Sequence, residues 1–311
     1  MTGLAVVRAI HLAAAIQTIG ALLFVWIIDE APPPSANPRP STWSQSFMHL
    51  AMFCVAVVAA SGVAWFALQI ADMTEGSLAE AWTSGAVSAV LFKTQAGIIW
   101  WVRLAIFTGL AILLVGFARS APNRAVVATA LTLAIANLTS CAWLSHAAGD
   151  PGTFGALHLG IHAAHMLAVS LWVGGLIPLT MVVSTMRSDC DNDVAAFVHC
   201  LGVRFGNIAL WSVALIVLTG IASTALVVQD ASDLTSGAYA KLLAAKLLLF
   251  LLMLLLATAN RQWLVPRLAG AKPSHAAMWL RRSVLGEVAL AGVVLLIVGA
   301  LGITAPGAAM D

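Results

Sequence analysis

Long apolar runs alternate with short polar stretches along the whole chain. Each run has about 20 residues or more, the length that an α-helix needs to cross the hydrocarbon core of a bilayer. The polar stretches carry residues typical of loops, such as APPPSANPRP at 31–40 and GDPG at 149–152. The pattern therefore predicts an all-α, polytopic membrane protein with eight transmembrane helices. The expected spans are residues 4–28, 46–71, 91–117, 124–145, 157–186, 203–228, 239–259 and 283–304.

The composition agrees with a membrane environment. Hydrophobic residues make up 61% of the 311 residues and charged residues only 9%, whereas a soluble domain carries about 25% charged residues. This leaves no room for a large soluble domain. The net charge of +2 says little about partners, and we expect no nucleic-acid partner. We expect the lipid bilayer to surround most of the chain.

The basic residues are unevenly distributed among the connectors. Arg and Lys follow the third, fifth and seventh spans, and five of them lie between residues 260 and 282. The connectors 72–90, 146–156 and 229–238 contain none. By the positive-inside rule, both termini are expected on the periplasmic side of a bacterial inner membrane. Arg8, close to the N-terminus, opposes this orientation.

The two halves of the chain share features at similar positions, which predicts an internal repeat of four plus four helices in parallel orientation. The expected halves are residues 1–145 and 146–311. The shared features are Ile10-His11 with Ile161-His162, Ser61-Gly62 with Thr219-Gly220, and the intramembrane cations Arg103 with Lys246.

Histidines gather where the second half begins. His158, His162 and His165 follow the spacing i, i+4, i+7 and fall on one helix face, with His146 just before them. Imidazole binds borderline and soft metals, and Met166 adds a thioether. We predict a metal site here, joined by His11 if the repeat holds. Interfacial histidines that bond loop carbonyls are the structural alternative.

A second patch could supply soft ligands at the start of the second span. Met48 and Met52 are four residues apart on one face, with His49 between them. Methionine in a membrane helix usually serves packing, so this patch is the weaker metal candidate.

Three charged residues fall inside predicted spans, where an unpaired charge is costly. They are Arg103, Lys246 and Glu287. Lys246 and Glu287 differ in expected depth, so we expect Glu287 to meet Arg261 or Arg282 at the cytoplasmic end. A structural ion pair and a role in an ion pathway both remain open.

Catalysis has no support in the sequence. No G-x-x-x-x-G-K-[ST] motif occurs, so ATP hydrolysis is not expected. No Ser–His–Asp order is convincing either. We expect no enzyme.

Four segments of the second half carry a family resemblance. They are HAAHMLAVSLWVGGL, RFGNIALWSVALIVLTGIASTALVV, YAKLLAAKLLLFLLMLLLATANR and RRSVLGEVAL. In this order they resemble the copper resistance protein D family of bacterial inner membranes, while the first half matches only in layout. Tyr239-Ala240-Lys241 stands where the family usually has Tyr-Gly-Arg. The resemblance implies a copper-handling permease that often acts with a small periplasmic copper-binding partner of the C type.

Three functions are compatible with these observations. Copper uptake into the cytoplasm, with the histidines as the outer capture site, is the leading hypothesis, since the membrane potential drives a cation inward without an ATPase. A membrane protein that holds b-type haem between histidines and transfers electrons is the first alternative. A copper-delivery or assembly factor that transports nothing is the second.

Overall fold

Eight long helices form the structure, a computed structural model that describes residues 2–29, 40–73, 78–117, 123–144, 152–186, 192–227 and 237–304. Within these residues, eight helices are long and apolar enough to cross a membrane, which confirms the predicted fold class. They are α1 (Thr2–Asp29), α2 (Pro40–Met73), α5 (Gln95–Phe117), α6 (Arg124–Thr139), α7 (Gly152–Val183), α8 (Asn192–Val227), α9 (Gly237–Ala259) and α11 (Pro273–Leu301).

Shorter helical segments complete the described chain. The 3₁₀ turn η1 (Ser140–Leu144) extends α6, and α9 continues through the π-helix η4 (Asn260–Leu264) into α10 (Val265–Arg267). The connector after α2 contains α3 (Leu78–Thr83) and α4 (Ala86–Lys93), which the apolar pattern does not reveal.

The third span begins later than its apolar run. Thr94 has extended backbone angles, and its hydroxyl accepts a hydrogen bond from the Gly97 amide at 3.1 Å. This is the geometry of a helix N-cap, so the predicted run 91–117 is divided at Thr94 into the end of α4 and the start of α5. Helices α7, α8 and α11 begin earlier than predicted because their polar first turns extend the helix beyond the apolar run.

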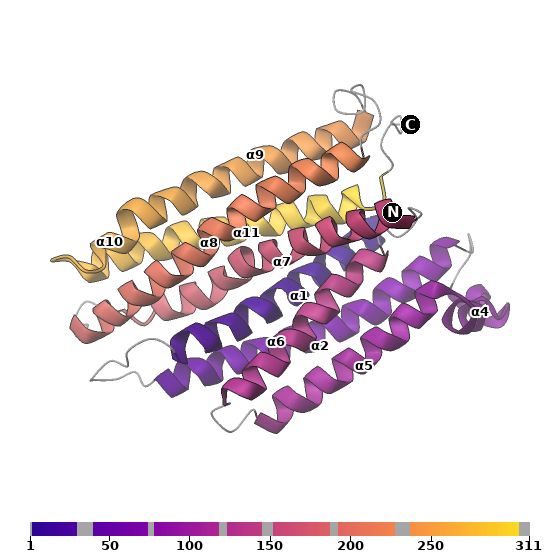
Figure 1. The fold of residues 1–311 in the computed structure, drawn as a ribbon, viewed down its shortest axis with the longest axis horizontal. Coiled ribbons are helices and arrows are strands. Elements are labelled where there is room, and N and C mark those ends of the chain that lie inside the picture. Colours follow the sequence, from indigo (N-terminus) through magenta and orange to yellow (C-terminus); the bar gives the residue numbers. More distant parts are fainter. Residues whose placement is uncertain are drawn as a thin grey trace.

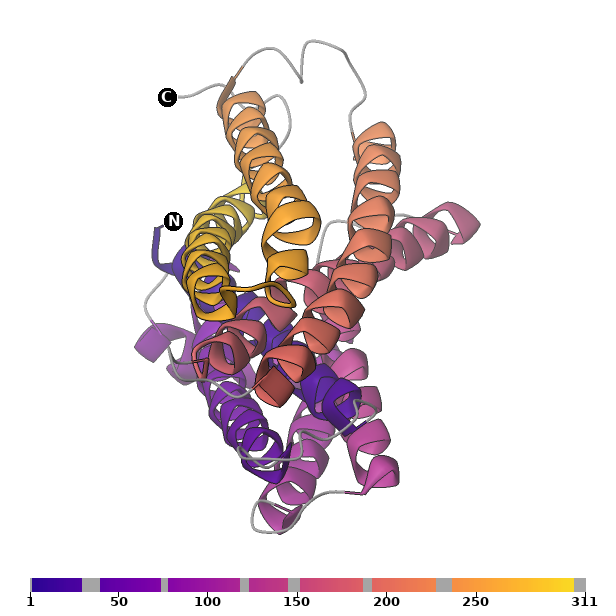
Figure 2. The same ribbon diagram turned by 90° about the vertical axis from the view of Figure 1, so that its left-hand side faces the viewer.

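The helices of each half lie on their own side of a central pair. Helix α1 packs on α2 and α6, α7 packs on α8 and α11, and α1 and α7 pack on each other. Figure 1 shows α1 and α7 side by side, and Figure 2 shows the later helices above the earlier ones. The start of α1, the end of α11 and α4 lie at the same end of the bundle (Figure 1), as an even number of spans requires.

The contact between α1 and α7 is a backbone contact. A Cβ built on Gly20 would overlap the carbonyl group of Gly174, so only glycine fits at this crossing. Pro178 in α7 has no N–H and cannot bond the Gly174 carbonyl one turn before it. The Gln17 side chain donates to that carbonyl at 2.9 Å instead. The helix-breaking effect of Pro178 is thus compensated from α1.

Arg8 has a structural explanation. Its guanidinium donates to the Gly302 carbonyl at 2.7 Å and lies 5.2 Å from the ring centroid of Trp65. Gly302 follows the C-terminus of α11, the negative end of the helix dipole. The cation near the N-terminus therefore caps a neighbouring helix.

We expect Gly20→Ala to destabilise the protein by about 1–3 kcal/mol, because the added methyl forces α1 and α7 apart. The measurement is thermal unfolding in detergent. Gly160→Ala is the matched control, since nothing lies within 4 Å of its Cβ position on α7. Equal melting temperatures for the two variants would contradict the close helix contact.

Candidate functional site

The histidines of α7 lie near the end of the bundle that holds the start of α1 and the end of α11. His158 is buried, while His162 and His165 are half-buried. Met166, one residue after His165, is also buried against neighbouring helices. His146 lies outside the described residues. The three described histidines project from adjacent turns of one helix.

His165 is held in a defined orientation by α8. Its Nδ1 lies 2.9 Å from the Thr219 hydroxyl, and that hydroxyl donates its own proton to the Leu215 carbonyl. The hydroxyl must therefore accept from Nδ1–H. The neutral tautomer that results carries a lone pair on Nε2. His165 is thus arranged in the way of metal-binding histidines, whose second nitrogen donates to an oxygen.

His11 of α1 makes a corresponding contact with α2. Its Nδ1 lies 3.1 Å from the Ser61 hydroxyl, which donates to the Val57 carbonyl at 2.6 Å. Its Nε2, however, lies 2.6 Å from a guanidinium nitrogen of Arg103 and accepts from it. Both ring nitrogens of His11 are therefore engaged, in contrast to those of His165.

The two hydroxyl–histidine contacts have the same surroundings. Each hydroxyl residue directly precedes a glycine in the sequence. The Cε1 atom of His11 lies 3.4 Å from the Cβ position of Gly62, and the Cε1 atom of His165 lies 3.8 Å from that of Gly220. These contacts align His11 with His165, whereas the sequence pattern pairs it with His162. The positions differ because helical faces recur every three or four residues, so a local sequence match can choose the wrong turn.

Arg103 is fully buried in α5 and has no carboxylate partner among the described residues. Besides His11, it bonds the Ser140 hydroxyl at 2.8 Å and the Cys141 sulfur at 3.0 Å. Its guanidinium carbon also lies 5.2 Å from the Trp100 ring centroid. Neutral acceptors and an aromatic face thus contact the cation predicted inside this span, while its Nε has no hydrogen-bond partner within the described residues.

Positive charges also lie close to the α7 histidines. His162 interacts electrostatically with Lys246 of α9 and Arg8 of α1, and His165 interacts with Lys246. Lys246 is half-buried on its helix. Across the described part of the chain, no group of three or more His, Cys, Asp or Glu side chains converges as metal ligands.

The second soft-ligand patch is divided between two environments. Met48 is buried in the core, Met52 is partly buried against it, and His49 is exposed. The side chain of His49 therefore points away from its neighbour Met48.

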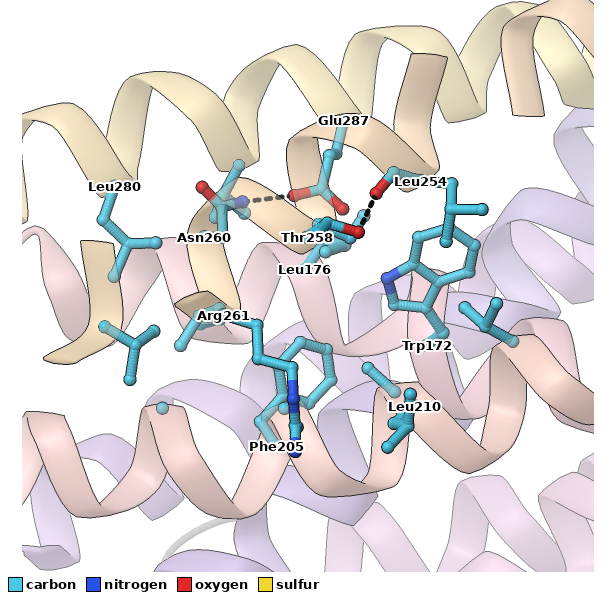
Figure 3. Close-up of a pocket in the computed structure, with 18 residues that line it drawn as sticks. Trp172, Leu176, Phe205, Leu210, Leu254, Thr258, Asn260, Arg261, Leu280 and Glu287 are labelled. Carbon is cyan, nitrogen blue, oxygen red and sulfur yellow. Dashed lines mark hydrogen bonds between the residues drawn. The ribbon is translucent and has the colours of Figure 1, made fainter. Parts of the chain in front are cut away.

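Glu287 lines a cavity of about 90 Å³ between α7, α8, η4 and α11 (Figure 3). Its Oε1 accepts a hydrogen bond from the Asn260 amide at 2.5 Å. The expected pairing with Arg261 or Arg282 is wrong, because Arg261 donates instead to the Asn207 side chain at 3.0 Å. Asn260 was missed in the sequence. Its amide at the end of a long apolar run was the signal that could have identified it.

Comparisons with known proteins cover both halves. The family model described as "Copper resistance protein D-like, N-terminal domain" matches residues 1–157, and the one described as "Copper resistance protein D" matches residues 201–301. The first half, which resembled the family only in layout, is thus matched as well. No solved structure matches the chain.

Three relatives are similar over much of the chain. Copper resistance protein D of Pseudomonas syringae pv. tomato is 28% identical, over 69% of this chain and 70% of its own. Inner membrane protein YebZ of Escherichia coli K12 is 25% identical, over 74% and 77%. Copper transport protein CutJ of Bacillus subtilis is 28% identical over 64% of this chain and only 37% of its own. With family matches in both halves, this multi-pass membrane protein belongs to the copper resistance protein D family.

Proposed function

We propose that this protein is a copper permease of the bacterial inner membrane that carries copper from the periplasm to the cytoplasm. Both termini and the histidine end of α7 face the periplasm in this proposal. The families in both halves and the names of the relatives support copper as cargo. The basic connectors at the opposite end support the orientation.

The observation that carries the proposal is the orientation of His165. The Thr219 hydroxyl fixes its Nδ1–H, so the Nε2 lone pair is held ready for a metal. Copper also needs ligands with soft or borderline donor atoms. His162 and Met166 are neighbours of His165 on α7 and supply an imidazole and a thioether, with His158 one turn earlier.

The charges near this histidine face favour Cu(I) over Cu(II). Lys246 and Arg8 act on His162 electrostatically and repel an arriving cation. Because Coulomb repulsion scales with charge, a monovalent ion meets half the opposition that a divalent ion meets. The Met166 thioether also prefers Cu(I). Cu(I) accepts few ligands, so two or three side chains of α7, with His146 as a further donor, suffice to capture it.

His11 has a different role in the proposal. Since Arg103 occupies its Nε2, His11 links α1, α2 and α5 instead of binding copper. The matching hydroxyl contacts of His11 and His165 support an internal repeat of two four-helix halves. In this repeat, the histidine of the first half, His11, holds helices together, and the corresponding histidine of the second half, His165, binds copper.

The membrane potential provides the driving force. One positive charge that enters the cell gains about 2.3 kcal/mol per 100 mV, so uptake needs no ATP hydrolysis and no catalytic site. A small periplasmic copper-binding protein of the C type would deliver the ion at the histidine end.

We expect His162→Ala and His165→Ala each to lower Cu(I) affinity by about 10-fold or more, because each removes an imidazole ligand. Competition with a Cu(I) chelator measures this on the purified protein. His275→Ala is the control, since His275 lies in α11 against Trp279 and away from α7. If both α7 variants bound Cu(I) with the affinity of the parent, the proposed copper site would be contradicted. A Soret band in the absorption spectrum of the same preparation would identify bound haem instead.

We expect Thr219→Val to lower Cu(I) affinity by about 10- to 100-fold, because His165 loses the acceptor that orients it. Ser61→Ala removes the matching hydroxyl of the first half and should leave copper affinity unchanged. The same chelator competition measures both variants. Equal losses of affinity in the two variants, or a loss only in Ser61→Ala, would contradict the proposal that copper binds in the second half.

A further inference from the structure

The cavity beside Glu287 lies on the way from the histidines to the opposite end of the bundle. Trp172 and Leu176 of α7 line it. Trp172 follows His165 by seven residues, which is about 10 Å along the helix. An ion that leaves the histidine face and moves along α7 toward α10 therefore passes this cavity.

Glu287 is almost completely buried in an apolar setting. Its exposed fraction is 1%, and most of the cavity lining is aliphatic or aromatic. The Trp172 indole faces the same carboxyl group (Figure 3). Oε2 of Glu287 and Oδ1 of Asn260 both lack a hydrogen-bond partner within the described residues. Two buried oxygens at one cavity are thus available to a ligand.

The π-helix brings Asn260 to this position. Pro266 has no N–H, so the carbonyl one turn before it cannot be bonded in the α-helical pattern. The chain changes to π geometry over Asn260–Leu264, directly before this proline. A π turn shifts side chains around the helix axis and is frequent at functional sites. In this case it directs the Asn260 amide at the carboxyl group of α11.

Within the described residues, no cation neutralises the carboxyl group. Arg261 is the only other titratable residue of the lining, and its guanidinium bonds Asn207 and extends toward α8, away from Glu287 (Figure 3). Helices α7, α8, α9 and α10 contribute no titratable side chain to the lining, and α1, which also packs on α11, contributes no residue. An ionised Glu287 would have the Asn260 amide as a donor but no counter-ion among the lining residues, and a buried carboxylate without a counter-ion is costly.

A proton is the ligand that fits. It neutralises the carboxyl group in the apolar cavity and leaves when water or a passing cation stabilises the carboxylate. The cavity volume of about 90 Å³ exceeds the roughly 10–15 Å³ that one water molecule needs. A water there can join the free oxygens of Glu287 and Asn260 and transfer the proton.

We propose that Glu287 is a proton-binding site whose proton is taken up and released during copper passage, so that copper transport is coupled to proton movement. The coupling rests on the proposed copper transport, whereas proton binding does not. Asn260 positions the carboxyl group, and the cavity provides the path for water.

Infrared spectroscopy tests proton binding without copper. With only 13 Asp and Glu residues in the chain, difference spectra between two pH values should resolve a protonated buried carboxyl group by a C=O band that shifts in D₂O. We expect this band in the parent and its loss in Glu287→Gln. Glu287→Asp should keep a band with an altered titration, and Asp72→Asn, at the exposed end of α2, should match the parent. A parent without the band, or a band that persists in Glu287→Gln, would overturn the site.

Sealed proteoliposomes test the coupling. The potential is clamped with potassium and valinomycin, a pH dye is enclosed, and Cu(I) is added outside. We expect copper entry to change the luminal pH in the parent and in Asp72→Asn, and the pH change to be lost in Glu287→Gln. Copper entry without a pH change in the parent would overturn the coupling and leave copper transport intact. A Glu287 infrared band without copper entry in any variant would contradict copper transport and leave the proton site intact.

Discussion

The backbone contact between α1 and α7 is the interaction on which the other features depend. Gly20 and Gly174 allow the two helices to touch, and Gln17 supplies the bond that Pro178 removes from α7. Since α1 packs on α2, α6 and α11, and α7 packs on α8 and α11, the contact fixes the position of α7 within the bundle. The histidine face and the cavity beside Glu287 both include side chains of α7, so this one crossing sets where both lie.

Polar groups inside the bundle fall into two classes. Arg103 and His11 bond each other and the side chains of Ser61, Ser140 and Cys141, and within the described residues Nε of Arg103 is left without a partner. At His165, and again at Glu287, donor or acceptor atoms are left over. In a low-dielectric setting an unsatisfied polar atom is costly, and a bound ion or water molecule can compensate for it. The contacts of Arg103 and His11 link α1, α2, α5 and η1, whereas His165 and Glu287 are where we propose that ions bind.

The sequence predicted much of the fold, because eight apolar runs of membrane-spanning length leave few alternatives. It also predicted that Arg103, Lys246 and Glu287 lie within helices. Partners were harder to predict, since contacts between helices depend on rotation about each axis. For this reason Glu287 was assigned to an arginine instead of Asn260, and His11 was aligned one turn away from His165. The π-helix that places Asn260 has no period that a hydrophobic pattern reveals.

Copper entry at the α7 histidines is the central claim, and Cu(I) uptake into sealed proteoliposomes tests it most directly. The vesicles hold a fluorescent Cu(I) indicator under an inside-negative potential, and the parent is compared with a double variant that lacks both imidazoles, His162→Ala with His165→Ala. We expect rapid uptake by the parent, acceleration as the potential becomes more negative, and a loss of at least about 10-fold in the double variant. Uptake by the double variant at the parental rate would contradict the account.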